Sequence, residues 1–398
     1  MRDSHLHLAA TEGLARMKWE DEVERTHYTD LLGFGTADMD YMCPGPMLDA
    51  LSEVIERGHL GYPMVQDEFY EAIHDHLLSV AGWDIDAWTS VAQNVGIYTS
   101  AWCLLDTLTK PGDRVTILTP VHMCFKSLIR LNGRVAIECP LVYSDGRYSI
   151  DFHSLEACLA SGSHIFWLCN PHNPIGHAWR KDELEKIAEL CIKYDALIMS
   201  DDVYSGLLFP GTVYTPIAAL GPEVSERTVT MYSTSKSYNS TGLRHSFIVA
   251  ENPELMKLYT DSLQRLQLSY GKNIMGMAAT IAAYRRCSGW LDELNAQIKK
   301  NHDYLSRFFK ENMLGLSVVP ADSIYFAWCD MRALRIPSKQ LSYLIECEEH
   351  MIVENGSDLG KGGDGFIRMN LATSEENLRE GARRIRDFWN KHSIGGGL

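Results

Sequence analysis

The sequence predicts an α/β protein built on a parallel or mixed sheet, with a smaller α+β part toward the C-terminus. Short apolar runs alternate with helix-like segments through the middle of the chain, and amphipathic helices dominate from about residue 281 onward. Fully apolar strands separated by helices are typical of a sheet that helices cover on both faces. At 398 residues, the chain is also long enough for two domains and a large core.

The candidate strands of the first part are short and almost wholly apolar. Between two of them, residues 180–194 place apolar side chains at helical spacing beside a charged face. Open α/β sheets bind ligands outside the carboxyl ends of their strands, so polar residues that follow these runs are candidates for a functional site. The runs are RVTILTP (114–120), RVAIECPL (134–141), HIFWLCNP (164–171), ALIMSDD (196–202), TVTMYS (228–233) and HSFIVA (245–250).

The C-terminal part reads as amphipathic helices with a few short strands. Helices are expected over 291–311 and 374–392, and strands over 323–330 and 365–372. The predicted organisation is an N-terminal segment, 1–50, that joins the small domain, a large domain over 51–285 and a small domain over 286–398.

Composition and charge exclude several classes of partner. The net charge of −15 opposes binding to nucleic acid or to an anionic membrane surface. No run of about 18 apolar residues predicts a membrane span, and the N-terminus lacks the apolar core of a signal peptide. The ten cysteines include no CxxC pair, which favours free thiols over a disulfide scaffold or a metal site. We therefore expect a cytoplasmic protein without a bound metal.

The stretch MYSTSKSYNSTGLRHSFIVA, residues 231–250, begins and ends as apolar strands but carries charged side chains between them. An isolated lysine such as Lys236 is most often a surface residue. Here Ser233 lies three residues before it and Arg244 eight residues after it. A lysine of lowered pKa can form a Schiff base, and a serine with an arginine can hold a phosphate. Together they predict pyridoxal 5'-phosphate (PLP) as the cofactor.

PLP makes further demands on the site. Its pyridine nitrogen needs a buried carboxylate, and Asp201 directly follows an apolar strand. Its phenolic oxygen needs hydrogen-bond donors, for which Tyr204 and Asn173 are candidates. Taken alone, the two aspartates at 201–202 are typical of a strand end or a helix cap, and NPHNPIG (170–176) is typical of a turn.

The ordered set resembles the fold-type I PLP enzymes of aminotransferase class I/II, and the resemblance extends over nearly the whole chain. It implies the PLP-transferase fold, with a seven-stranded, mostly parallel sheet in a large domain, a small α+β domain formed by both chain ends, and a homodimer with shared active sites. The residues that carry it are Asn173, Asp201, Tyr204, Ser233, Lys236 and Arg244.

Further elements resemble the MalY/PatB subgroup, which comprises cystathionine β-lyases and other C–S lyases. In the N-terminal third these are TADMDYMCPGPMLDAL (36–51), GHLGYP (58–63) and AGWDI (81–85). SIYFAWCD (323–330) and DGFIRMNLA (364–372) are similar to its C-terminal signature. The resemblance implies a PLP-dependent lyase acting on an amino-acid substrate.

The resemblance also implies a role for each matching residue. Lys236 would form the Schiff base and move protons at the substrate Cα, and Asp201 would pair with the pyridinium. The donors to the phenolic oxygen would be Asn173 and Tyr204. The phosphate would be held by Ser233, Arg244 and the backbone N–H groups of Ile97 and Tyr98, which open a predicted helix.

On the substrate side, Arg368 would bind the α-carboxylate. An arginine inside the apolar stretch FIRMN also needs an anionic partner if it is buried. Tyr62 would reach in from the neighbouring subunit as a catalytic and substrate-binding residue, and Asp38 would lie on the substrate side.

Some positions depart from the pattern of the subgroup. His122 stands where an aromatic ring usually stacks on the cofactor, and it could either stack or titrate near neutral pH. Tyr204 and Arg244 are more typical of aminotransferases. The element GFGTADMDY (33–41) lacks the tryptophan that the subgroup usually carries there. These changes suggest a specialised substrate.

The leading hypothesis is a C–S β-lyase that cleaves a cysteine S-conjugate by α,β-elimination to a thiol, pyruvate and ammonia. An aminotransferase is the second hypothesis, and decarboxylation or oxidative deamination on the same scaffold is a third. A ligand-sensing regulator fused to a DNA-binding module is disfavoured, because the family-like motifs begin by Thr36 and the net charge is acidic.

Overall fold

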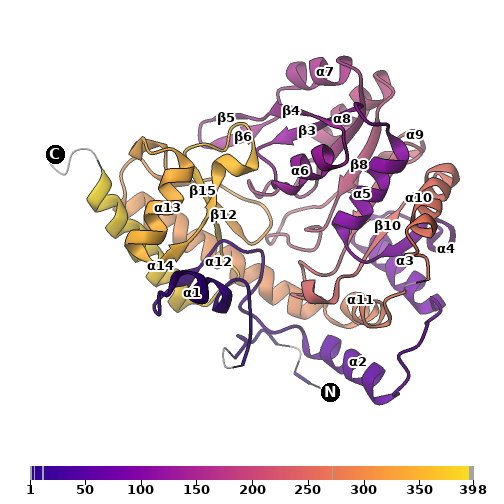
Figure 1. Ribbon diagram of the computed structural model, residues 1–398, viewed down its shortest axis with the longest axis horizontal. Coiled ribbons are helices and arrows are strands. Elements are labelled where there is room, and N and C mark those ends of the chain that lie inside the picture. The colour runs from indigo at the N-terminus through magenta and orange to yellow at the C-terminus, as the bar shows by residue number, and fades with distance from the viewer. Residues whose placement is uncertain (1, 4, 11–12, 271, 394–398) are drawn as a thin grey trace.

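The computed structural model describes residues 2–3, 5–10, 13–270 and 272–393 (Figure 1). Its central feature is a seven-stranded sheet with the order β2-β10-β9-β8-β7-β3-β4. β10 runs opposite to the other six strands of this sheet, which are parallel to one another, so the predicted mostly parallel sheet is confirmed. Its strands are β2 (Val91–Asn94), β3 (Arg114–Thr119), β4 (Val135–Pro140), β7 (Ser163–Cys169), β8 (Leu197–Asp201), β9 (Thr228–Tyr232) and β10 (Ser246–Val249).

Helices cover both faces of this sheet, as the apolar strands predict. Along β7, Ile165 and Trp167 join one hydrophobic cluster, whereas Phe166 and Leu168 join another, because successive side chains of a strand point to opposite faces. The first cluster is closed by α5 (Ile97–Leu108), α6 (Cys124–Leu131) and α10 (Pro253–Arg265), and the second by α7 (Phe152–Ala160) and α8 (Lys181–Lys193).

A smaller antiparallel sheet lies beside the large one and has the order β11-β12-β15-β14. Its helices are drawn in orange to yellow in Figure 1. The strands are β11 (Ser317–Val318), β12 (Phe326–Asp330), β14 (Glu354–Asn355) and β15 (Phe366–Asn370). The helices around it are α12 (Ser288–Asn312), α13 (Ser338–Glu349) and α14 (Glu375–His392).

The N-terminal segment packs against this smaller sheet. β1 (Leu32–Gly33) pairs in parallel with β13 (Met351–Ile352), and Arg25 at the end of α1 (Glu20–Thr26) bonds to Glu346 of α13. We keep the predicted division into 1–50 plus 286–398 and 51–285 as a proposal, which the start of α12 at Ser288 supports.

The remaining elements are helices, turns and a hairpin around the two sheets. α11 (Ile274–Arg286) packs on α2 (Gly45–Glu56) and α3 (Asp67–Ala81), and a short α4 (Ala87–Ser90) leads into β2. The others are short: the hairpin β5 (Val142–Ser144) and β6 (Arg147–Ser149), α9 (Pro222–Ser225), and the 3₁₀ turns η1 (Ile217–Leu220), η2 (Thr241–Leu243), η3 (Arg332–Leu334) and η4 (Gly356–Leu359).

A charged imidazole ties the loop after β7 to α8 and to the segment between β11 and β12. His177 Nδ1 lies 3.1 Å from Asp322 Oδ2, and its Nε2 lies 2.9 Å from Glu183 Oε2. Burial alone would lower the pKa of His177, but the hydrogen bonds to the two carboxylates outweigh it and raise the pKa to about 9. The imidazolium is therefore charged at neutral pH and fixes the loop that carries Asn173.

All ten cysteines are free thiols. Across the described ranges, no helix combines the length and the apolar character that a membrane crossing requires. Nor do three or more His, Cys, Asp or Glu side chains come together as a metal site anywhere in that part of the chain.

Candidate active site

One pocket collects most of the predicted site residues. It opens where β3, β7, β8 and β9 end, as expected for an open α/β sheet. Residues from the N-terminal segment and from the start of α5 complete its walls. The predicted residues that line it are Ile97, Tyr98, His122, Asn173, Asp201, Tyr204, Ser233, Lys236 and Arg244.

Lys236 lies in the turn after β9, and its amine points toward the N-terminal segment. Its Nζ donates a hydrogen bond of 3.1 Å to the carbonyl oxygen of Ala37. Burial lowers the pKa of Lys236 to about 8, although the nearby Asp38 carboxylate opposes the shift. A substantial share of the amine is therefore neutral near physiological pH, which makes it a nucleophile and a base.

Asp201 is the last residue of β8 and is buried at the base of the pocket. Among the described residues, only the backbone N–H of Val203 donates to its carboxylate, at 3.3 Å. Burial raises the pKa of Asp201 to about 7. The side chain of Asp202 is committed elsewhere, because it accepts hydrogen bonds from Ser200 and Tyr214. Of the two aspartates, Asp201 is thus the one that can receive a cationic group in the pocket.

Asn173 and Tyr204 form the wall between the two sheets. The Asn173 Oδ1 atom accepts a hydrogen bond of 3.1 Å from Arg368 Nη1, so its Nδ2 group is left as a donor. Tyr204 packs edge-on against Tyr325, with ring centroids 5.8 Å apart. The amide of Asn173 and the phenol of Tyr204 thus line the same pocket as Asp201, where both could donate hydrogen bonds to an oxygen atom of a ligand.

The opposite end of the pocket is built to hold an anion. Helix α5 begins at Ile97 after Gly96, whose φ of +145° favours glycine, and the first N–H groups of a helix have no intrahelical partner. The Arg244 side chain lines the pocket and has no hydrogen bond or ion pair within the described residues. An unpaired guanidinium opposite a helix N-terminus suits a phosphate.

Two serines close to Lys236 in the sequence, Ser233 and Ser235, line the pocket. Ser233 is buried, and its hydroxyl donates to the carbonyl oxygen of His245 at 2.7 Å. Its oxygen in turn accepts from the backbone N–H of Ser235 at 3.2 Å. Ser235 also lines the pocket. Sequence reasoning named Ser233 alone, although the hydroxyl-rich stretch pointed to Ser235 as well.

His122 lies beside Tyr98, with nearly parallel rings at 10° and Nδ1 3.5 Å from the phenolic oxygen. Burial lowers the pKa of His122 to about 3, and the positive charges of Arg368 and Lys236 act in the same direction. The imidazole is therefore neutral at physiological pH. Of the two roles left open by the sequence, this favours ring stacking over titration.

With the fold and the pocket described, comparisons with known proteins identify the family. The model of the family "Aminotransferase class I and II" matches residues 29–385. The chain belongs to this family. Cystathionine beta-lyase PatB of Bacillus subtilis is 32% identical over 375 residues, which cover 94% of this chain and 96% of PatB. Protein MalY of Escherichia coli is 27% identical over 366 residues, covering 92% and 93% of the two chains. The predicted MalY/PatB resemblance is confirmed.

Solved structures agree with this assignment of the aminotransferase class I and II chain. Cystalysin from Treponema denticola, which contains a pyridoxal 5'-phosphate cofactor, has a TM-score of 0.93 and 27% identity, covering 98% of this chain and 99% of cystalysin. A PLP-bound putative aminotransferase from Clostridium difficile has a TM-score of 0.92 and 28% identity, covering 96% and 99%. The fold predicted from the sequence is therefore that of fold-type I PLP enzymes.

Three predicted site residues of this family member do not line the pocket, namely Asp38, Tyr62 and Arg368. Asp38 follows Ala37, and its backbone oxygen accepts from Asn370 Nδ2 at 2.7 Å. Burial raises the pKa of Asp38, while the Lys18 ammonium lowers it. Tyr62 lies in the loop between α2 and α3 and is 90% exposed. Its predicted role depends on a second subunit.

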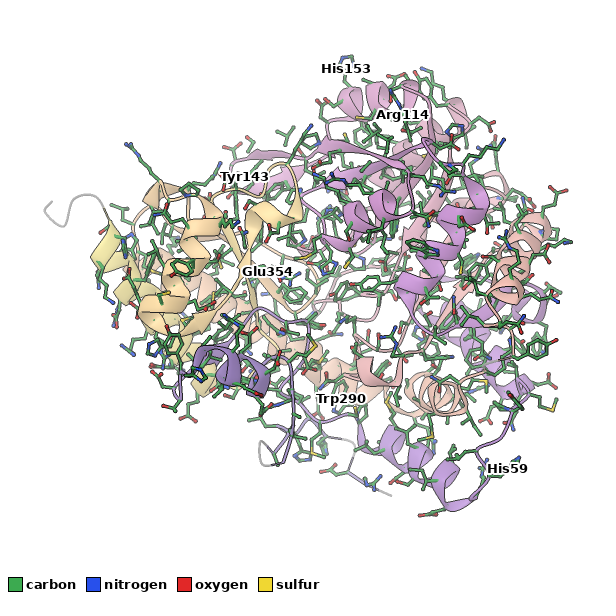
Figure 2. The ribbon with its side chains drawn as sticks, viewed as in Figure 1. His59, Arg114, Tyr143, His153, Trp290 and Glu354 are labelled. Carbon is green, nitrogen blue, oxygen red and sulfur yellow. The ribbon has the colours of Figure 1, made fainter. Side chains whose placement is uncertain are left out.

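Arg368 lies on β15, behind Asn173, with its side chain almost fully buried. Its guanidinium lies 4.0 Å from the centre of the Phe326 ring. It also pairs with Glu354, a residue that sequence reasoning missed in this aminotransferase class I and II chain. Figure 2 shows Glu354 near the middle of the molecule, where the two sheets meet. The acidic residue in the apolar stretch IVEN was only a weak sign of a site residue, because the strand register, which the sequence does not show, decides that Glu354 faces Arg368.

Proposed function

We propose that the chain is a PLP-dependent carbon–sulfur lyase that converts a cysteine S-conjugate and water into a thiol, pyruvate and ammonia. One observation carries the proposal. Lys236, an amine of lowered pKa, shares a pocket with Asp201, a buried carboxylate that has no cationic hydrogen-bond partner in the part of the chain that the structure describes. The names of PatB, a cystathionine beta-lyase, and of cystalysin, which contains the cofactor, support it.

The residues of the pocket fit the cofactor. Asp201 would hold the ring nitrogen, with Asn173 and Tyr204 at the phenolic oxygen and His122 against the ring face. The phosphate would lie between the start of α5 and three side chains, those of Ser233, Ser235 and Arg244. When bound, PLP supplies an electron sink that stabilises negative charge at the substrate Cα.

The chain's own residues would then orient the substrate and move its protons. Arg368 would hold the α-carboxylate, which fixes the orientation of the bonds at Cα. Lys236 Nζ would accept the proton from Cα. The C–S bond breaks with its electron pair on sulfur, and the departing thiolate takes up a proton. The burial of Lys236 helps, because a pKa near neutrality suits an amine that both accepts and returns protons.

An aminotransferase is the alternative that a specific observation favours. The unpaired Arg244 and the phenol of Tyr204 are the aminotransferase-like features of the pocket, and a putative aminotransferase is among the solved structures it resembles. Both residues lie on the cofactor side, where they would hold the cofactor for any reaction. Groups around the substrate decide which bond is activated, so we place the lyase first and leave decarboxylation and oxidative deamination behind both.

The proposal is tested with a panel of cysteine S-conjugates and no added keto acid. We expect repeated turnover, with thiol and pyruvate released in equal amounts, measured by a thiol reagent and a coupled lactate dehydrogenase assay. Serine and alanine are the controls, because they lack a thiolate leaving group. A single turnover that resumes only when a keto acid is added would instead identify an aminotransferase. Carbon dioxide release with the sulfur retained would identify a decarboxylase.

We also propose a homodimer in which Tyr62 completes the partner's site. Tyr62 is 90% exposed and has two exposed apolar neighbours, Leu60 at 64% and Met64 at 80%, which a second copy would cover. The location is proposed to be cytoplasmic, because the cysteines are free and in the described residues no helix could span a membrane.

Mixed dimers test the placement of Tyr62. Tyr62→Phe and Lys236→Ala are each expected to be nearly inactive. If Tyr62 serves the partner's site, their mixed dimer contains one intact site, and random assembly should restore about a quarter of wild-type activity. Mixtures that stay inactive, although exchange of tagged subunits is shown by pull-down, would mean that Tyr62 does not act across the interface.

A further inference from the structure

The hydrogen bonds that Arg368 already makes leave it no two neighbouring N–H groups free to bind both oxygens of a carboxylate. Its Nη1 donates to Asn173 Oδ1 at 3.1 Å. Its Nη2 donates twice, to the carbonyl oxygen of Gly35 at 3.1 Å and to Glu354 Oε2 at 3.0 Å. The buried Nε has no hydrogen-bond partner among the described residues.

A guanidinium binds a carboxylate through one of two pairs of nitrogens, Nε with Nη2 or Nη1 with Nη2. Both pairs include Nη2, and both hydrogens of that atom are already engaged. A ligand carboxylate can therefore bind Arg368 at two points only if one of these two acceptors leaves. The Nε–H group has no acceptor among the described residues, and leaving a buried donor without an acceptor is costly. A ligand carboxylate would therefore bind at the pair formed by Nε and Nη2.

Of the two acceptors on Nη2, only Glu354 can leave. The other is the backbone oxygen of Gly35, which the chain fixes. Glu354 lies on β14, an edge strand of two residues, directly opposite Arg368 on β15. Its side chain is 20% exposed, compared with 2% for Arg368, so it can turn toward solvent while the arginine stays in place.

We propose that Glu354 is a specificity-determining residue that occupies the place of the substrate α-carboxylate on Arg368 and is displaced when substrate binds. The inference rests on the role proposed above for Arg368. In the free enzyme, Glu354 keeps the buried guanidinium paired. In the complex, the substrate carboxylate would take over Nη2 and fill Nε.

The charges around Glu354 set the cost of this exchange. Arg368 attracts its carboxylate and Asp358 of η4 repels it. The negative charge of Glu354 also acts on the Cys124 thiol of α6, whose pKa it helps to raise. While it stays ionised near Arg368, Glu354 also repels the incoming carboxylate, and at such short range this repulsion is strong. The wild-type enzyme should therefore bind carboxylate ligands more weakly than the lone Arg368 charge would allow.

The test compares L-alanine, which has a charged carboxylate, with L-alaninamide, in which a neutral amide replaces it, on the PLP-loaded enzyme by titration calorimetry. Glu354→Gln keeps the shape of the side chain but removes its charge. We expect it to lower the dissociation constant of L-alanine about tenfold and to change that of L-alaninamide less than twofold. Glu354→Ala should shift L-alanine in the same direction, and the exposed Glu189→Gln is the matched control.

Each other outcome overturns the proposal. Weaker L-alanine binding in both Glu354 variants would mean that Glu354 positions Arg368 rather than competing with the ligand. Equal shifts for both ligands would mean a general change of the pocket. A Glu354→Gln variant that binds both ligands equally would show that no ligand carboxylate reaches Arg368. Because alanine has no leaving group, none of these results depends on lyase activity, which the thiol-release assay tests separately.

Discussion

Replacing Lys236 by alanine is expected to lower turnover by about a thousandfold or more, because the variant loses both the nucleophile and the base of the site. The amine is held in a buried setting, 3.1 Å from the carbonyl oxygen of Ala37, and its pKa is lowered to about 8 by burial. The anion site and Asp201 do not depend on it. The variant should therefore still bind PLP, but without a covalent bond.

Borohydride reduction followed by mass spectrometry separates these two effects. The wild-type chain should gain the mass of the reduced cofactor, and Lys236→Ala should not, although it retains PLP through gel filtration. The exposed Lys310→Ala is the matched control and should behave as wild type in both assays. A Lys236→Ala variant that still turns over substrate, or is still labelled, would assign the covalent role to another lysine.

Replacing Arg368 by alanine is expected to raise KM about a hundredfold or more, because a buried, charge-assisted contact to the substrate carboxylate is lost. The cofactor absorbance should stay the same, since Arg368 does not itself line the pocket and its hydrogen bond to the pocket wall goes to Asn173. Arg368→Lys keeps the charge but not the two-point contact, so its KM should rise less, by about tenfold.

The split between KM and the cofactor spectrum is the informative readout for Arg368. A general loss of structure would change both, whereas loss of the carboxylate contact changes KM alone. The exposed Arg307→Ala removes a guanidinium elsewhere on the small-domain side and serves as the control. Wild-type KM in Arg368→Ala would refute the assignment.

Much of the large sheet could be predicted because its strands are nearly all apolar and their ends carry the polar residues. Lys236, Asp201 and Asn173 each lie at the end of such a run or shortly after it. Because ligands of open α/β sheets bind at the carboxyl ends of the strands, the sequence predicted that these three residues share one site. Local periodicity was also sufficient for the last helix, which was expected over 374–392 and is found at Glu375–His392.

The features that sequence reasoning missed or left open depend on pairing and burial. Glu354 meets Arg368 only through the register of two short antiparallel strands, and register is not a local property. The neutral state of His122 follows from its burial and from two distant cations. The role of Tyr62 needs a second chain.

The pairing of β1 with β13 also has a consequence for how this chain folds. Asn370 Nδ2 donates to the carbonyl oxygen of Thr36 across 334 residues of sequence. The segment that holds β1 leaves the ribosome long before β13 and β15 do, so Phe34 and Met39 stay without their native cover until those later strands have been made. Contacts of such long range slow folding and expose apolar surface to aggregation. The carbonyl oxygen of Ala37, which accepts from Lys236, therefore takes its place only after β15 has been made.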